Sequence, residues 1–107
     1  MRYLVRANFI DGKMGEFFRK LSDGTIAGQK PEGKEILASM QRAKIAAPGV
    51  IEWCESCYCA TPLRHERATV YDHYFTNMQT KEIDADPDIP GDFFWEYLRG
   101  HTSASEP

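Results

Sequence analysis

The chain has 107 residues, 42% of them hydrophobic and 27% charged, as expected for a single soluble globular domain. Its 13 lysines and arginines stand against 16 aspartates and glutamates, and the net charge of −3 gives no electrostatic reason to bind nucleic acid. Arg2 and Arg6 interrupt the only apolar stretch near the start, so we expect no signal peptide, no membrane span and a cytoplasmic protein. We expect one domain over residues 1–99 and a disordered polar tail over residues 100–107.

Hydrophobic periodicity predicts the first two elements. Residues 2–10 alternate between two faces, which is typical of a strand covered on one side. After the turn at Asp11 and Gly12, apolar residues recur at helical spacing with charged residues between them, which predicts a helix that packs one stripe on the sheet. The side chains on the covered face of the strand are Tyr3, Val5, Ala7 and Phe9, and the helical stripe is Met14, Phe17, Phe18, Leu21 and Thr25.

Residues 34–46 fit two descriptions. Ile36, Leu37, Met40 and Ala43 have helical spacing, whereas the preceding Pro31 and Gly33 also allow a strand. The turn sequence Ala47-Pro48-Gly49 follows, and the next residues, 50–59, are rich in β-branched and aromatic side chains. We therefore predict that residues 34–46 and 50–59 are the two strands of a hairpin.

The rest of the chain predicts a second helix, a strand, an arm and a terminal helix. Thr61 and Pro62 are typical of a helix start, as the cap and the first helical residue. Residues 75–83 predict a last strand, and the acidic, proline-containing residues 84–91 predict a linker or wrapping arm. A short helix is predicted over residues 92–99, with one side formed by Phe94, Trp95 and Leu98.

This βαββαβ order resembles the ferredoxin-like sandwich, an α+β fold with a four-stranded antiparallel sheet and both helices on one face. More narrowly, it is similar to the dimeric α+β barrel proteins, which include antibiotic-biosynthesis monooxygenase-like, muconolactone isomerase-like and YciI-like domains. The resemblance covers the order of elements over most of the chain and rests on no sequence motif. It implies a fold and a homodimeric habit, and it assigns no catalytic residue.

The uncovered face of such a sheet is a physical reason to expect a homodimer. Leu4, Ile10 and part of the strand at 50–59 would lie on this face, which is too apolar to leave in water. Two such faces paired about a two-fold axis would cover it. The aromatic group at residues 93–95 would then seal the edge or reach the second subunit.

Three cysteines, Cys54, Cys57 and Cys59, lie close together, and their odd number argues against a disulfide framework. Two thiolates can bind one metal ion or each other, so the cluster is a candidate transition-metal or redox site. On a strand, however, Cys57 and Cys59 would share the face of Trp53, and Cys54 would point the other way. We therefore expect buried core thiols and no cofactor, with thiolate metal binding as the alternative.

The predicted second helix carries His65, Arg67, Tyr71 and His73. The two histidines would lie about 12 Å apart along the helix axis, too far to chelate one ion, and they do not form a zinc-protease motif. Arg67 falls within the apolar stripe, where its guanidinium needs an internal acceptor or an anionic ligand. We expect an ion pair within the chain.

Arg6 and Asn8 lie on the second face of the first strand, beside polar residues expected there such as Glu55 or Gln41. An apolar cavity with a few polar groups is typical of a small-molecule site, so the leading hypothesis is a dimeric small-molecule-binding protein. A cofactor-independent oxygenase or isomerase is its enzymatic version, but no phosphate loop, nucleophile elbow or paired carboxylates on one element indicate an enzyme. A thiol-based metal or redox sensor and a protein-interaction module are the alternatives. The residues expected at the ligand are Arg6, Asn8, Trp53, His65, Arg67 and Tyr71.

Overall fold

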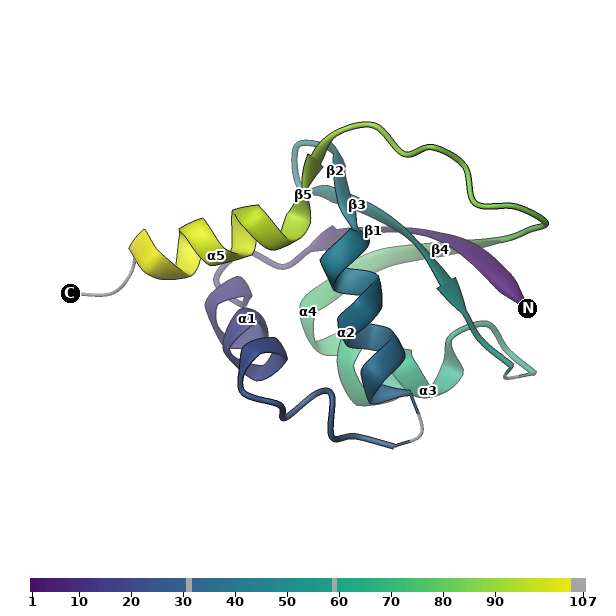
Figure 1. The fold of residues 1–107 in the computed structure, drawn as a ribbon, viewed down its shortest axis with the longest axis horizontal. Helices are drawn as coiled ribbons and strands as arrows, with labels where there is room; N and C mark the ends of the chain where they lie inside the picture. Colours follow the sequence, from purple (N-terminus) through teal and green to yellow (C-terminus); the bar gives the residue numbers. More distant parts are fainter. Residues whose placement is uncertain (31, 59, 105–107) are drawn as a thin grey trace.

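The computed structural model describes residues 1–30, 32–58 and 60–104. It is an α+β fold with an open antiparallel sheet in the order β4-β1-β3-β2-β5, and the helices gather on one side of this sheet (Figure 1). The strands are β1 (Arg2–Phe9), β2 (Lys44–Ala47), β3 (Val50–Ser56), β4 (Phe75–Ile83) and β5 (Asp92–Phe93). The helical elements are α1 (Met14–Ser22), α2 (Gly33–Arg42), α3 (Arg64–Glu66), η1 (Arg67–Tyr71), α4 (Asp72–Tyr74) and α5 (Phe94–Ala104). We refer to α3, η1 and α4 together as the helical segment Arg64–Tyr74.

The central strand forms as the periodicity predicts, and the first helix does so up to Ser22, so that Thr25, predicted in its apolar stripe, lies beyond the helix and is exposed. In β1, alternate side chains are buried against the helices, and the strand pairs antiparallel with β3 on one side and β4 on the other. In α1, one stripe is buried and the charged residues stay at the surface. The buried side chains are Tyr3, Val5 and Ala7 in β1 and Met14, Phe17 and Leu21 in α1.

The prediction of a strand over residues 34–46 is wrong for most of its length. Residues Gly33–Arg42 form α2, and the chain becomes extended at Ala43, where ψ is 151°. Ile36, Ser39 and Met40 are all buried on one side of α2, and a strand could not arrange this because it would turn Ser39 to the face opposite Ile36 and Met40. Burial of this stripe against the sheet therefore decides in favour of the helix.

The hairpin is correct in its second half. β2 and β3 pair antiparallel around Pro48 and Gly49, and Gly49 has a φ of +75°, a conformation that glycine adopts without steric cost. The following helical segment starts later than predicted. Thr61 and Pro62 precede it, and the first helical residue is Arg64, whose N–H donates to the carbonyl of Thr61.

The acidic arm, residues 84–91, adds the fifth strand. It leaves β4 at one edge of the sheet and reaches β5 at the opposite edge, where Asp92 and Phe93 pair with β2 (Figure 1). Arg2 anchors it, with its Nε and Nη2 donating to the carboxylate of Asp86 at 2.8 and 2.7 Å. The prediction of four strands is thus wrong by one, because the pairing of an arm with a sheet edge leaves no periodic signal in two residues.

The C-terminal aromatic residues complete the core of their own chain. Phe94 and Leu98 on α5 are fully buried, whereas Phe93 is 49% exposed. α5 continues beyond the predicted end at Arg99 to Ala104, and residues 105–107 lie outside the described part of the chain. Among the described helices, α5 included, none is both long and apolar enough to cross a membrane.

Candidate functional site

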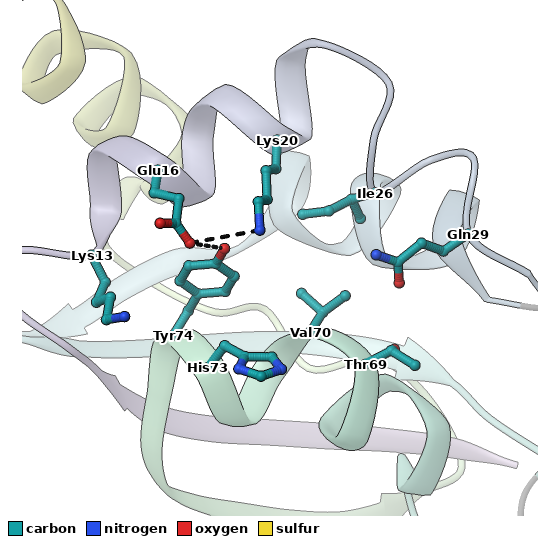
Figure 2. A pocket seen from close by; sticks show the side chains of 9 residues that line it. All are labelled: Lys13, Glu16, Lys20, Ile26, Gln29, Thr69, Val70, His73 and Tyr74. Carbon is teal, nitrogen blue, oxygen red and sulfur yellow. Dashed lines mark hydrogen bonds and ion pairs between the residues drawn. The ribbon is translucent and has the colours of Figure 1, made fainter.

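A cleft of about 150 Å³ lies between α1, the loop that follows α1, and the helical segment Arg64–Tyr74 (Figure 2). This volume is far above the roughly 10–15 Å³ that one water molecule requires, so the cleft can hold a molecule of several heavy atoms. Ile26, Val70 and Tyr74 are almost fully buried and form its apolar surface. The polar lining residues are Lys13, Glu16, Lys20, Gln29, Thr69 and His73.

The polar side chains of this cleft come together because of helical spacing. Lys13, Glu16 and Lys20 are three and four residues apart, so they form one stripe along α1 that faces the helical segment (Figure 2). This stripe adjoins the apolar stripe that α1 buries in the core. Across the cleft, Thr69 and His73 have the same spacing on the helical segment. The cleft therefore lies where the polar edges of two amphipathic helical elements meet.

Tyr74, Glu16 and Lys20 form a fixed polar group at the centre of the cleft. The Tyr74 hydroxyl donates to Oε2 of Glu16 at 2.6 Å, and Nζ of Lys20 lies 3.7 Å from the same oxygen. The hydrogen bond from Tyr74 and the charge of Lys20 lower the pKa of Glu16, so this carboxylate stays ionised. Burial and the bond to Glu16 raise the pKa of Tyr74, so its hydroxyl stays protonated. This group is suited to hold a ligand in place and has no activated nucleophile.

Gln29 contributes an unsatisfied acceptor to the cleft. Its backbone is held on both sides, because its N–H donates to the carbonyl of Ile26 at 3.0 Å and its carbonyl accepts from Gly33 at 2.9 Å. Its side-chain Oε1 is buried and has no hydrogen-bond partner within the described residues. A buried acceptor without a donor costs about 1–3 kcal/mol, and a bound ligand or water that donates to it would recover part of this cost.

We expect Gln29→Leu to stabilise the protein by about 1 kcal/mol, because it removes this acceptor while keeping most of the side-chain volume. Urea unfolding followed by circular dichroism would measure the change. Gln41→Leu, at an exposed position on α2, is the matched control and should change stability by less than about 0.5 kcal/mol. A clear loss of stability in Gln29→Leu would show that the carbonyl is already satisfied.

A second cluster, which the sequence did not reveal, is a buried pair of carboxyl groups. Glu55 on β3 and Glu66 on α3 are both fully shielded from solvent. Trp53 Nε1 and the Tyr71 hydroxyl both donate to Oε1 of Glu55, at 2.8 and 2.6 Å. The other oxygen of Glu55 and both oxygens of Glu66 make no well-formed hydrogen bond among the described residues, although contacts of Glu66 with the Cys57 thiol and with Glu55 act to lower its pKa. A proton held between the two carboxyls would satisfy one oxygen of each, which two ionised groups cannot do.

Burial sets the protonation state of this pair. Loss of solvation raises the pKa of Glu55 to about 8. The negative charge of Glu66 raises it further, and the hydrogen bonds from Tyr71 and Trp53 oppose the rise. Burial also raises the pKa of Glu66. Glu55 is therefore mainly a neutral acid at pH 7. Since both carboxyls are shielded from solvent, we assign the pair to folding stability rather than to chemistry on a ligand.

A π-helical turn explains how Glu66 and Tyr71 both reach Glu55. In a π-helix each N–H bonds to the carbonyl five residues before it, so side chains five positions apart lie on nearly the same side. η1 follows Glu66 directly and ends at Tyr71, which is five residues further on. In a regular α-helix the same two side chains would point in different directions. The same turn leaves Val70 on the side of the cleft.

The residues predicted to surround one ligand lie in different parts of the structure. Trp53 and Tyr71 come together in the core, with ring centroids 5.2 Å apart, and bind Glu55. Arg6 and Asn8 lie on the opposite, open face of the sheet, where Nη1 of Arg6 is 3.3 Å from Oε2 of Glu52. The expectation that Glu55 faces this open side is wrong, because the register places Glu55 opposite the buried Tyr3.

Two of the three ligand residues predicted on the helical segment, His65 and Arg67, lie at its surface. Nδ1 of His65 is 3.5 Å from a carboxylate oxygen of Glu32. Arg67 forms an ion pair within the chain, with Nε 3.3 Å from Oδ1 of Asp72, but the pair is exposed and Arg67 does not lie in the apolar stripe where the sequence placed it. Neither residue lines the cleft of Figure 2, which instead receives Thr69, Val70, His73 and Tyr74 from this segment.

Cys54 and Cys57 are both buried, but Cys57 follows the end of β3 and packs in the core cluster, so strand alternation does not decide its direction. Burial raises the pKa of the Cys54 thiol, which is the opposite of the change that makes a cysteine reactive. Cys59 lies outside the described residues. Over the described ranges, no three histidine, cysteine, aspartate or glutamate side chains are grouped so that they could hold a metal ion. Thiolate binding of a metal by Cys54, Cys57 and Cys59 stays a prediction.

Comparisons with protein-family models, with curated proteins and with solved structures found no match for this chain. The cleft and the buried carboxyl pair are therefore interpreted from their own geometry and chemistry.

Proposed function

We propose that this protein binds a small polar molecule in the cleft between α1 and the helical segment Arg64–Tyr74. The observation that supports this most is the lining, in which lysine, glutamate, glutamine and histidine side chains surround an apolar floor. A few directed polar groups over an apolar surface are typical of a small-molecule site. The proposal keeps the class of function expected from the sequence and moves the site from the open face of the sheet to the helical side.

A set of small fragments, observed by amide chemical shifts in the 15N-labelled protein, would test this function. We expect the shifts to concentrate in residues 13–20, 26–29 and 69–74. Thr69→Tyr, at an exposed lining position, should fill the mouth of the cleft and weaken binding at least about tenfold. Ala68→Tyr, the neighbouring exposed position outside the lining, is the matched control and should bind as the wild type does. Equal weakening by both variants, or shifts elsewhere, would contradict the proposal.

We also propose that the fold is a ferredoxin-like variant that forms a homodimer through the open face of its sheet. The strand order β4-β1-β3-β2 is compatible with a ferredoxin-like sheet to which β5 is added. In-register side chains form a row across the open face, so a second copy would be held by charge pairs as well as by apolar contact. The row consists of Gln79, Arg6, Glu52, Lys44 and Phe93.

Sedimentation velocity would test the homodimer. We expect a dimer at micromolar concentration, and Arg6→Glu should shift it toward the monomer because it places a second negative charge beside Glu52. Lys34→Glu, an equal change of charge at an exposed position on α2, on the other side of the sheet, provides a comparison for the effect of net charge alone. A monomeric wild-type protein at high micromolar concentration would contradict the proposal.

A further inference from the structure

The cleft concentrates positive charge on an acidic protein. The whole chain has a net charge of −3, yet Lys13 and Lys20 line one cavity with a single carboxylate, that of Glu16. That carboxylate is already engaged by the Tyr74 hydroxyl and by Lys20. The charge of Lys13 acts on Glu16 only from a distance, since it helps to lower the pKa of this carboxylate without forming an ion pair among the described residues, and its ammonium group can therefore turn to a ligand. A cleft of this kind attracts anions, and its low-dielectric walls strengthen the attraction.

The same cleft also contains a buried acceptor that lacks a hydrogen-bond donor. Oε1 of Gln29 is buried and has no donor within the described part of the chain. Figure 2 shows Gln29 at the opposite end of the cleft from Lys13, with Lys20 between them. Amide carbonyls accept hydrogen bonds and cannot hold an anion, so the group that meets Gln29 must be an N–H or O–H. A ligand that meets both ends directly, without a bridging water, therefore has an anionic part near the lysines and a neutral donor near Gln29.

The cleft walls between the lysines and Gln29 limit the chemistry and size of the rest of the ligand. Ile26 and Val70 are each 1% exposed and give the cleft an apolar surface, which favours a short hydrocarbon chain. The volume of about 150 Å³ admits only a small molecule.

Resting on the function proposed above, we propose that the cleft binds a short hydroxy carboxylate. Its carboxylate would accept hydrogen bonds from Lys13 and Lys20, and its hydroxyl would donate to Oε1 of Gln29. Its carbon chain would lie against Ile26 and Val70. Inorganic phosphate shares the anionic chemistry, but it offers no apolar part to this surface, so it should bind more weakly.

Three matched probes separate these requirements in a chemical-shift titration at pH 7 and low salt. The probes are 3-hydroxypropionate, propionate, which lacks the hydroxyl, and 3-hydroxypropionamide, which lacks the charge. We expect the hydroxy acid to bind with a millimolar Kd, propionate about three- to tenfold more weakly, and the amide about tenfold more weakly. Inorganic phosphate, as a fourth probe, should also bind more weakly than the hydroxy acid.

Two variants test which residues cause these differences in affinity. Lys13→Met should weaken both acids about tenfold and leave the amide unchanged, while Lys81→Met, far along the exposed strand β4, serves as the matched control. Gln29→Leu should remove the advantage of the hydroxy acid over propionate and leave propionate itself unchanged.

The outcomes distinguish this inference from the proposed function. Equal binding of the acid and the amide would overturn the anionic class, and equal binding of the two acids would overturn the role of Gln29. In both cases, fragment binding in the cleft would leave the proposed function standing. If neither the probes nor the fragment set shift residues of the cleft, both proposals fail.

Discussion

The free energy of unfolding should fall as the pH rises from about 5 to about 8, because the folded protein holds a proton on Glu55 that the unfolded chain releases. Burial raises the pKa of this group from its ordinary value of 4.5 to about 8. Below the unfolded value both states are protonated and the stabilisation is fully present. It is lost as the pH rises through the folded value, at roughly 1.4 kcal/mol per pH unit for one proton. The total loss should reach a few kcal/mol.

Glu55→Gln should abolish most of this pH dependence. The amide keeps the oxygen that accepts from Trp53 and Tyr71 and carries no charge at any pH in this range. Urea unfolding at pH 5, 6, 7, 8 and 9 measures the profile. Glu82→Gln, at an exposed position on β4, should keep the wild-type slope. A wild-type protein whose stability is constant or rises over this range would contradict the assignment of a buried proton.

The second large effect is expected for Gly33→Ala. A Cβ at Gly33 would lie 2.1 Å from the backbone oxygen of Ile26 and 2.9 Å from that of Ala27. Neither backbone atom can rotate away, so α2 or the loop must move, and this overpacking should cost on the order of 2–3 kcal/mol. The gain in helix propensity, at most about 1 kcal/mol, is too small to offset it. The loop that would move carries Ile26 and Gln29, so ligand binding in the cleft should also weaken.

Gly15→Ala is the matched control for this change. Gly15 lies within α1, and a Cβ there would meet no atom within 4 Å. The variant should therefore be more stable than the wild type, by roughly 0.5–1 kcal/mol, since alanine loses less conformational entropy in a helix. Thermal unfolding of both variants compares the two effects directly. If Gly33→Ala were also stabilising, the close contact between α2 and the Ile26 carbonyl would be ruled out.

The sequence predicts the elements whose periodicity is clear and fails where two periods compete. β1, α1 and β4 have one strong pattern each, and they form where predicted. The stretch 34–46 contains both a helix and the start of a strand, with the change at Ala43, so one description cannot cover it. Ile36, Leu37 and Met40 were the available signal for the helix, because they share one side of a helix, whereas a strand would turn Leu37 to the other face.

The candidate site was less accessible to sequence reasoning, for two reasons. The cleft takes its residues from three segments. Its lysines have the spacing of an ordinary solvated stripe on α1. They line a cleft only because Val70 and Tyr74 pack against α1. The carboxyl pair depends on the π-helical turn of η1, which brings Tyr71 to the side of Glu66. Alternation along β3 did indicate that Glu55 shares the buried face of Trp53, and this was the one signal for the pair.

A crystal structure of the protein soaked with 3-hydroxypropionate tests the central claim most directly. The predicted result is electron density for one molecule in the cleft of Figure 2, with its hydroxyl within hydrogen-bond distance of Oε1 of Gln29 and its carboxylate near both Lys13 and Lys20. Density against Arg6 and Asn8 on the open face of the sheet, with the cleft closed by its own side chains, would contradict it.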